Sequence, residues 1–403
     1  MIVPQALELR ATGIQSSCRW HSKIVRSLPG AVLEGVTDLD ASARADAARS
    51  FGTRELESAE ALVAQEEIDV VCICTPPTSH ADLIESAAAR GKHVLVEKPL
   101  APSLADADRA LAACAAHGVH LGVVHQQRAR SATRAVHRLV TEGALGKPVT
   151  VVAIHTWFKT PEELANDSWR GDSATGGGML FDQAVHAIDL LVWYLGEPLW
   201  VTGATSSAAH DTTGEDTAVA TIGFAGPVAA TLAASTAANL MRDDIAIELA
   251  GTRGGLRLEI RDYDHAEIVR LNLAGSDHHR ARALSVPEIE ALVRTEGGSW
   301  RDGPRSSVWR AAARLAGTER GRHPFRSPRA YLRRRADRVA QEERGQPQGH
   351  AAVIEQMAAA ARGEGAPLVT GEDARASIAI VEAIHRSAST GGGRIELIGP
   401  ERH

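Results

Sequence analysis

Residues 94–101 read Val-Leu-Val-Glu-Lys-Pro-Leu-Ala. Three apolar residues followed by Glu-Lys-Pro predict a buried strand that stops at the proline, because proline cannot extend a hydrogen-bonded ladder. Upstream, residues 72–80 read Cys-Ile-Cys-Thr-Pro-Pro-Thr-Ser-His and predict a second apolar strand that ends in a proline-rich turn. Open α/β sheets bind ligands at the carboxyl ends of their strands, so we expect Lys98 and the upstream turn to share one crevice. The alternative interpretation of Lys98 is a solvated lysine in a surface turn.

Strand-like and helix-like segments alternate along the first 127 residues. Strands are expected at residues 6–12, 32–38, 68–74, 94–97 and 119–124. Helices are expected at residues 41–51, 59–65, 80–90 and 104–117, with an earlier helix that ends near residue 28. This alternation predicts a doubly wound parallel sheet of the α/β class, and therefore a Rossmann domain over residues 1–127.

An acid closes the second expected strand, at Asp38. A strand, a helix and a strand that ends in an acid form the dinucleotide-binding arrangement, in which the helix N-terminus receives the pyrophosphate. Asp38 is then expected to bind the adenosine ribose hydroxyls, and its charge favours NAD over NADP because it repels a 2′-phosphate. The alternative is that Asp38 caps the helix that begins at Ala41.

The second half of the chain has a different pattern. A strand is expected at residues 149–158, a flexible turn at 173–178, and a helix at 179–195 that ends before Gly196. Several strand-like runs follow within residues 200–260, among them 217–224, 228–234 and 244–249. Helices at about 351–362 and 372–389 and a strand at 394–397 complete the chain. Runs of strands after one helix predict a separate α+β domain with an antiparallel sheet, over residues 128–403.

Length and composition exclude several classes of protein. The chain has 403 residues, enough for two domains, and a net charge of −6, which gives no general attraction to nucleic acid. No apolar run reaches the roughly 18 residues of a membrane helix, and the first residues lack the basic start of a signal peptide. The cysteines have no zinc-binding spacing, so we expect reduced thiols, no metal site and a cytoplasmic protein. They are Cys18, Cys72, Cys74 and Cys114.

Residues 301–346 form an arginine-rich segment with 13 arginines and five acids. We predict a helical insertion here. One interpretation is a solvated helical pair that covers the second domain or meets an acidic neighbouring subunit. A second is a lid over an anionic substrate, such as a phosphorylated sugar, since arginine pairs bidentately with phosphate. Nucleic-acid binding is a third, but few aromatic side chains are present for stacking on bases.

Several short motifs occur together in one order along the chain. They are Cys74-Thr75-Pro76-Pro77 with His80, Glu97-Lys98-Pro99, Trp169-Arg170, Gly176-Gly177-Gly178, Asp182 with His186 and Asp189, Gly371-Glu372-Asp373-Ala374 and Ala383-Ile384-His385-Arg386-Ser387. With this ordered set the chain resembles the Gfo/Idh/MocA family of NAD(P)-dependent oxidoreductases. The resemblance implies a Rossmann domain, then a domain with a large, mostly antiparallel open sheet that usually serves an oligomer interface. It implies redox chemistry at a hydroxyl of a sugar, cyclitol or similar substrate.

The resemblance also assigns roles to residues. It makes Lys98, Asp182 and His186 the catalytic set, with His186 as acid/base, Lys98 as an orienting or proton-relaying cation and Asp182 as a substrate ligand. Asp182 and His186 are four residues apart, so on a helix both project from one face. Alternatively, His186 is a buried core histidine; Asp189 is expected to be structural. Trp169 and Arg170 are expected to join the catalytic set in binding substrate. The expected cofactor-binding residues are Gly13, Ile14, Asp38, Thr75, Pro76, His80, Glu97 and Lys98.

The phosphate-binding loop departs from the family pattern. Aligned with Gly-x-Gly-x-x-Gly, it has Gly13, Gln15 and Cys18, one glycine of three. A variant loop geometry, an unusual mode of cofactor binding and a loss of dinucleotide binding therefore stay open.

We predict an NAD-dependent enzyme that interconverts a secondary hydroxyl and a ketone on a sugar-like substrate, assembled as a homodimer or homotetramer. Two alternatives remain: an enzyme of the same family that retains NAD and cleaves a glycosidic bond, and a cofactor-free relative that serves as a binding subunit.

Overall fold

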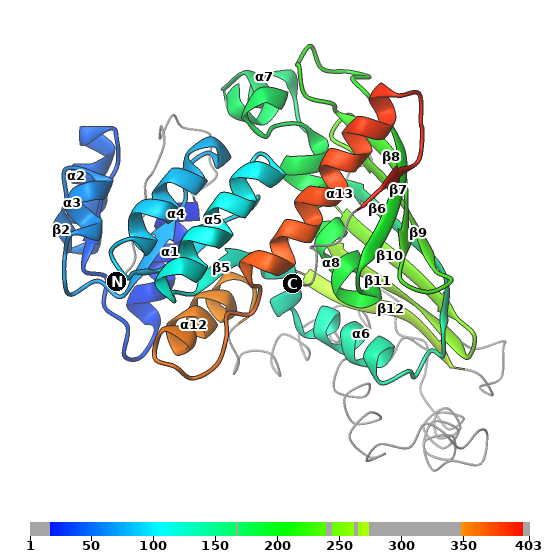
Figure 1. Cartoon of the computed structure of the whole chain (residues 1–403), viewed down its shortest axis with the longest axis horizontal. Coiled ribbons are helices and arrows are strands. Elements are labelled where there is room, and N and C mark those ends of the chain that lie inside the picture. Colours follow the sequence, from blue (N-terminus) through cyan, green and yellow to red (C-terminus); the bar gives the residue numbers. More distant parts are fainter. Residues whose placement is uncertain (1–16, 167, 239–243, 262–264, 274–347, 398–403) are drawn as a thin grey trace, which may run out of the picture.

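The computed structural model describes residues 17–166, 168–238, 244–261, 265–273 and 348–397. A lobe of parallel strands and helices stands beside a lobe built on one large sheet (Figure 1). The expected strand at 6–12, the loop residues Gly13 and Ile14, and the arginine-rich segment at 301–346 lie outside the described residues. None of the helices in the described ranges has the length and apolar character needed to cross a bilayer.

The first lobe contains a parallel sheet of three strands in the order β3, β4, β5. These strands are Val70–Ile73, His93–Glu97 and Leu121–Val124. The surrounding helices are α1 (Ser17–Ser27), α2 (Ala41–Phe51), α3 (Ala59–Val63), α4 (His80–Ala88) and α5 (Leu104–His117). Nearly every residue of the three strands is buried, as expected of strands covered by helices on both faces. The predicted Rossmann class is confirmed.

The expected strand at 32–38 is much shorter in the structure. Only Gly35–Val36 (β1) is strand, and it pairs in parallel with Arg54–Glu55 (β2). The sequence did not reveal β2, because two exposed charged residues carry no strand pattern. The alternative role of Asp38 as helix cap is wrong: Asp40 caps α2, and its carboxylate accepts the backbone N–H groups of Ser42 and Ala43.

The second lobe is built on an eight-stranded sheet in the order β12, β11, β10, β6, β9, β8, β7, β13. Its strands are β6 (Pro148–Thr156), β7 (Pro198–Ser206), β8 (Thr217–Phe224), β9 (Ala229–Ser235), β10 (Asp244–Gly251), β11 (Gly254–Arg261), β12 (His265–Leu273) and β13 (Ile395–Glu396). Every neighbouring pair is antiparallel except β6 and β9. The predicted large, mostly antiparallel sheet is confirmed.

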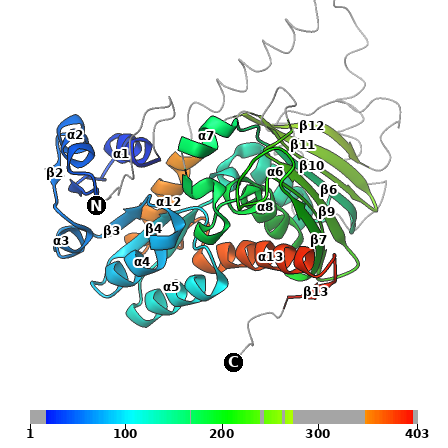
Figure 2. The ribbon, with the colours of Figure 1, turned by 90° about the horizontal axis from the view of Figure 1, so that it is seen from above.

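Helices cover one face of this sheet. They are α6 (Ser131–Thr141), α8 (Val185–Leu195) and α13 (Gly371–Ser389), and Figure 2 shows α8 and α13 between the sheet and the first lobe. Helix α12 (His350–Ala361) belongs spatially to the first lobe, because Val353, Ile354 and Met357 share a core with Ile24 and Val25 of α1. The chain therefore returns to the first lobe after β12, before α13 and β13 complete the second lobe.

Candidate active site

Strand β4 ends with two charged residues whose side chains diverge. Side chains alternate along a strand, so Glu97 and Lys98 leave the strand end on opposite sides. The Glu97 carboxylate contacts His21, whereas the Lys98 ammonium group lies 3.5 Å from the Asp182 carboxylate. Lys98 also donates a hydrogen bond to the backbone carbonyl of Asp182. The surface-turn alternative for Lys98 fails, because only 13% of its side chain is exposed.

Asp182 lies in a π-helical turn, Leu180–Ala184, that runs directly into α8. Single π turns within helices occur frequently at functional sites. The sequence predicted one helix over residues 179–195, and the structure shows this helix with the π turn at its start. Asp182 and His186 are both buried, with about 1% of each residue exposed.

The expected flexible turn at 173–178 is a tightly fitted loop that ends at three glycines. A Cβ atom on Gly177 would lie 2.3 Å from the carbonyl oxygen of Trp169, so only glycine fits there. Gly178 has φ near +95°, and a Cβ atom on it would collide with the Glu215 carboxylate. The Gly178 N–H donates to the Arg170 carbonyl at 2.8 Å. The glycines thus set the position of the Trp169-Arg170 pair against the π turn.

Three cationic side chains surround the Asp182 carboxylate. Lys98 comes from the end of β4, Lys159 from the chain after β6, and Arg170 from the turn before the glycines; each forms an ion pair with it. The Arg170 guanidinium also stacks on the ring of Trp169, 4.4 Å from its centroid. Burial alone would raise the pKa of Asp182, but Arg170, Lys159 and Lys98 together hold it well below its usual value. Asp182 is therefore ionised.

His186 is one of three buried histidines near Lys98. The ring of His125, which directly follows β5, meets the His186 ring edge-on with centroids 6.1 Å apart. Burial, then the charge of Lys98, lowers the pKa of His155 on β6 to about 3. Burial, the Lys98 charge and the two other histidines lower the pKa of His186 well below its usual value. The His186 imidazole is therefore neutral at physiological pH.

Asp189 lies one turn beyond His186 and serves another purpose. Its two carboxylate oxygens accept hydrogen bonds from the buried Arg128 guanidinium at 2.9 and 2.7 Å. Arg128 also pairs with Asp373, at 3.4 Å, near the start of α13. This bridge joins α8 to the segment after β5 and to α13, which supports the expected structural role of Asp189.

The Pro-Pro turn after β3 is tied to the turn after β4. His80 is buried, and its Nε2 lies 2.8 Å from the Thr75 carbonyl oxygen. Its Nδ1 lies 3.0 Å from the carbonyl oxygen of Pro99 and 3.2 Å from that of Leu100. The ring of His80 therefore faces the backbone of its own chain and ties the Thr75 carbonyl to the turn that follows Lys98.

The other described residues that were predicted to bind the cofactor lie at or just after strand ends. Asp38 follows β1 and is buried, and its Oδ1 accepts the backbone N–H of Asp40 at 2.9 Å. Thr75 and Pro76 follow β3, while Glu97 ends β4. The ends of β3 and β4 are neighbours in one parallel sheet, whereas β1 pairs with β2 in a separate two-stranded sheet. Neighbouring carboxyl ends of parallel strands suit a dinucleotide.

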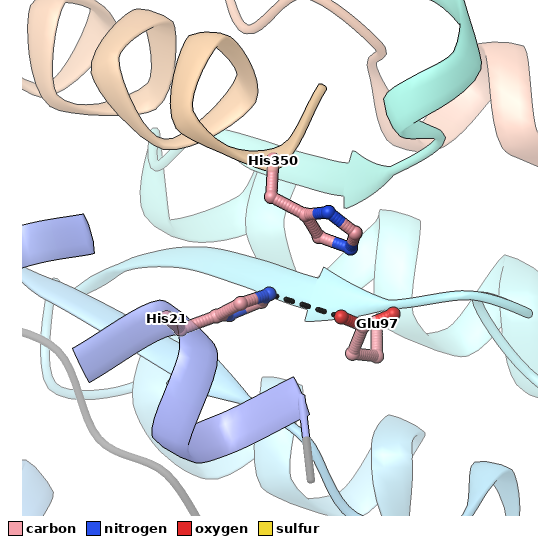
Figure 3. Close-up of side chains that lie close together, drawn as sticks. All are labelled: His21, Glu97 and His350. Carbon is pink, nitrogen blue, oxygen red and sulfur yellow. Dashed lines mark ion pairs between the residues drawn. The ribbon is translucent and has the colours of Figure 1, made fainter. Parts of the chain in front are cut away.

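Glu97 lies between two histidines from distant parts of the sequence (Figure 3). His21 on α1 reaches one carboxylate oxygen at 3.0 Å, and His350 begins α12 on the other side. Burial would raise the pKa of Glu97, but His21, His350 and Lys98 lower it to about 2. Within the described residues, these three side chains form a group whose donor atoms lie within 4.8 Å, a spacing that a metal ion can bridge. Because His21 contacts Glu97 directly, the three side chains form an imidazole–carboxylate cluster.

Sequence reasoning missed five residues of these two clusters. The sequence contains a signal for His155. Val151, Ala153 and His155 alternate along a strand and share its buried face, where a titratable side chain is unexpected. Lys159 and His125 each follow a strand but belong to no motif. His21 and His350 are brought to Glu97 only by the packing of α1 and α12, which no local pattern indicates.

Comparison with known proteins agrees with this geometry. A family model described as "Oxidoreductase family, NAD-binding Rossmann fold" matches residues 13–125, and one described as "GFO/IDH/MocA C-terminal domain" matches residues 133–257. The chain belongs to the Gfo/Idh/MocA family of oxidoreductases. Its first lobe is the NAD-binding Rossmann domain of that family, and the resemblance inferred from the sequence motifs is confirmed.

Individual relatives are distant. D-apiose dehydrogenase from Paraburkholderia graminis is 29% identical over 278 residues, which cover 67% of this chain and 70% of the relative. 1,5-anhydro-D-fructose reductase from Ensifer adhaerens is 31% identical over 179 residues, 44% of this chain and about half, 53%, of that enzyme. The crystal structure of the WlbA dehydrogenase from Bordetella pertussis with NADH and UDP-GlcNAcA has a TM-score of 0.76 at 22% identity, covering 99% of this chain and 98% of that one. This last likeness shows a shared fold.

Proposed function

We propose that this protein is an NAD-dependent dehydrogenase or reductase that interconverts a secondary hydroxyl and a ketone on a sugar-like substrate. The observation that carries the proposal is the meeting of Lys98, Asp182 and His186 at the carboxyl end of β4, on the second lobe's side of that strand end. The names of the relatives, a sugar dehydrogenase and a sugar reductase, support the substrate class.

Each residue has a task that its surroundings suit. His186 accepts the hydroxyl proton in the oxidising direction and returns it in the reducing direction, starting from the neutral imidazole that burial and the Lys98 charge favour. Lys98 provides positive charge beside the oxygen on which negative charge develops. Burial lowers the pKa of Lys98, and the Asp182 carboxylate opposes that effect, so Asp182 helps to keep Lys98 charged.

The described part of the first lobe has residues that suit a nicotinamide dinucleotide. Asp38 presents a carboxylate at the end of β1, which is the chemistry that the adenosine ribose hydroxyls need. Thr75, Pro76 and Glu97 are at neighbouring strand ends. When bound, the dinucleotide supplies the hydride acceptor or donor. NAD is proposed over NADP because the Asp38 charge disfavours a 2′-phosphate.

The first experiment is a cofactor assay on freshly purified protein. The protein is denatured and the supernatant assayed for NAD(H) and NADP(H), and the cofactor-free protein is titrated with each dinucleotide. Saturable NAD binding, followed by NADH formation from a member of a sugar and cyclitol panel, is the expected result. If neither dinucleotide binds, the proposal is overturned.

The same assay separates the proposal from its rival within the family. An enzyme that uses NAD transiently to cleave a glycosidic bond keeps its cofactor through purification. It therefore yields stoichiometric NAD on denaturation, with no net NADH formation on any sugar. A glycoside panel would then replace the sugar panel, and the role of His186 in proton transfer would be tested on bond cleavage.

A further inference from the structure

The imidazole–carboxylate cluster of His21, Glu97 and His350 lies on the first lobe's side of the end of β4. Its three side chains come from three separate elements, α1, β4 and α12, and their donor atoms lie within 4.8 Å of one another. Figure 3 shows the two imidazole rings approaching the carboxylate from different sides. Imidazole nitrogens and carboxylate oxygens are zinc ligands in proteins. The cluster therefore has both the donor types and the convergence of a metal site.

The closest pair in the cluster has the spacing of two ligands of one ion. Nε2 of His21 and Oε1 of Glu97 are 3.0 Å apart, yet among the described residues neither atom makes a hydrogen bond of normal geometry. Leaving a buried polar atom without such a bond costs free energy. Zinc lies about 2.0–2.2 Å from nitrogen and oxygen ligands, so adjacent ligands are about 3–3.5 Å apart. A shared ion would satisfy both buried atoms.

The other polar atoms of His21 and Glu97 are held by the protein. Nδ1 of His21 lies 3.5 Å from Sγ of Cys74, and Oε2 of Glu97 accepts the backbone N–H of Lys98 at 3.3 Å. Outer contacts of this kind orient the ligands of metal sites. Because Cys74 contacts the nitrogen of His21 that faces away from Glu97, it orients the ring. The atoms that remain, Nε2 and Oε1, are the ones that meet.

A glycine turn brings the third donor to the cluster. Gly349 has φ near +57°, and a Cβ atom on it would lie 3.3 Å from the guanidinium carbon of Arg130, so glycine suits this position. His350 follows it and begins α12, which shares a buried core with α1. The ring centroids of His350 and His21 are 5.7 Å apart. The packing of α12 on α1 thus supplies a second imidazole from a distant part of the sequence.

We propose that His21, Glu97 and His350 bind one divalent metal ion of the zinc type, which fastens α12 to α1 and β4. The expectation of no metal site rested on the spacing of the cysteines, and none of these three donors is a cysteine. Two nitrogen donors favour zinc over magnesium and calcium, which prefer oxygen ligands. Zinc with three protein ligands completes its coordination with water. Zinc binding here does not depend on the proposed function of Lys98 and His186.

Zinc binding is measured by calorimetry on the untagged full chain after dialysis against a chelator. Zinc sulfate is the probe, magnesium chloride is titrated in parallel, and no dinucleotide is present. We expect one zinc ion per chain with a dissociation constant of about 1 μM or tighter, and no binding of magnesium at the same concentrations. Zinc should also raise the melting temperature, because an ion that binds only the folded chain stabilises it.

Three variants locate the ion. His350→Gln and Glu97→Gln each remove a ligand and should weaken zinc binding by at least about 100-fold, since even an outer contact of a ligand is worth about 10- to 100-fold. His117→Gln is the matched control, because His117 is an exposed histidine at the end of α5 in the same lobe. It should bind zinc as the wild type does. Melting temperatures without zinc show that each variant is folded.

Three results overturn the proposal. If the wild type shows no saturable zinc binding, the cluster is an ion pair alone. Zinc affinity that is unchanged in His350→Gln, or lost in His117→Gln, places the ion at other histidines. Loss of both the binding and the zinc-dependent rise in melting temperature in His350→Gln, with His117→Gln unaffected, supports it. Because no dinucleotide is present, a failure here leaves the proposed dehydrogenase activity to its own cofactor assay.

Discussion

Glu97 and Lys98 are neighbours in the sequence but belong to clusters of opposite character. The Glu97 carboxylate lies between two imidazoles, His21 and His350. Lys98 belongs to a group of two lysines and one arginine around the Asp182 carboxylate. Both carboxyl groups have lowered pKa values despite their burial. Glu97 is thus paired with imidazole, whereas Asp182 is paired with ammonium and guanidinium groups.

The two clusters connect different parts of the molecule. The imidazole cluster joins α1, β4 and α12, all in the nucleotide-binding lobe. The cationic cluster joins the end of β4 to the second lobe, from which Asp182, Lys159 and Arg170 come. One strand end thus supplies a carboxylate to the first lobe and an ammonium group to the second lobe, and the alternation of side chains along the strand separates them.

The largest expected effect is at His186, which stands beside the cationic cluster. His186→Ala should lower turnover by about 10²–10⁴, the usual contribution of a general acid or base. Turnover is followed as NADH formation with the sugar that the panel identifies. Asp189→Asn on the same helix is the control: it should cost stability by breaking the Arg128 bridge while the folded enzyme still turns over. Near-normal turnover in His186→Ala would remove it from the acid/base role.

Asp182→Asn should break the cationic cluster itself. The amide leaves buried cations without their counter-charge, which costs about 3–5 kcal/mol of the free energy of unfolding. Displaced cations should also lower turnover by roughly 100-fold, because small misplacements at a site have effects of that order. Urea unfolding and initial rates measure the two losses. Asp82→Asn, an exposed partner of Arg109, should change stability by less than about 1 kcal/mol. An unchanged urea midpoint in Asp182→Asn would show that the cluster does not depend on the carboxylate.

Gly177→Ala should disturb the cationic cluster around Asp182 indirectly, by moving the turn that carries Arg170. The added methyl group would lie 2.3 Å from the Trp169 carbonyl oxygen, so the turn that carries Arg170 must move. We expect a stability cost of about 1–3 kcal/mol, as for other overpacked sites. We expect the KM for the sugar substrate to rise, because the Arg170 side chain shifts relative to Asp182. An unchanged KM in the folded variant would mean that the glycine matters for folding alone.

The sequence predicted the parts of the fold that depend on local pattern. The apolar strands at β3 and β4, the capped helix α5 and the helix through His186 all have periodicity that one segment carries by itself. The strand β2 was missed because its two residues are exposed and charged. Pairing with β1, and not a pattern of its own, makes this segment a strand. Helix α12 was recognised as a helix, but its docking on α1 is a long-range contact with no local signal.

The candidate site, like the fold, could be predicted from the sequence only in part. Lys98, Asp182 and His186 were predicted because the motifs that hold them are short and ordered, and the structure brings them together. Lys159 was not, because a lone lysine after a strand looks like any surface lysine until the fold buries it against Asp182. The structure adds that the ring nitrogens of His80 face carbonyl groups of neighbouring turns, which its sequence motif does not show.

The smallest effect we expect is on the acid stability contributed by Glu97. Its pKa in the folded protein is about 2, below the usual 4.5 of a glutamate. A lowered carboxyl pKa adds stability that is present above the unfolded value and is lost as pH falls through the folded value. Wild-type stability should therefore decline between about pH 5 and pH 2, and Glu97→Gln should be less stable at neutral pH but decline less steeply.

Thermal unfolding across that acid range measures the two slopes. His350→Gln is the matched variant, because it keeps the carboxylate and removes one of the groups that lower its pKa. Its slope should lie between those of the wild type and Glu97→Gln. If Glu97→Gln keeps the wild-type slope, the imidazoles do not stabilise the Glu97 carboxylate. The contrast between the two clusters would then rest on Asp182 alone.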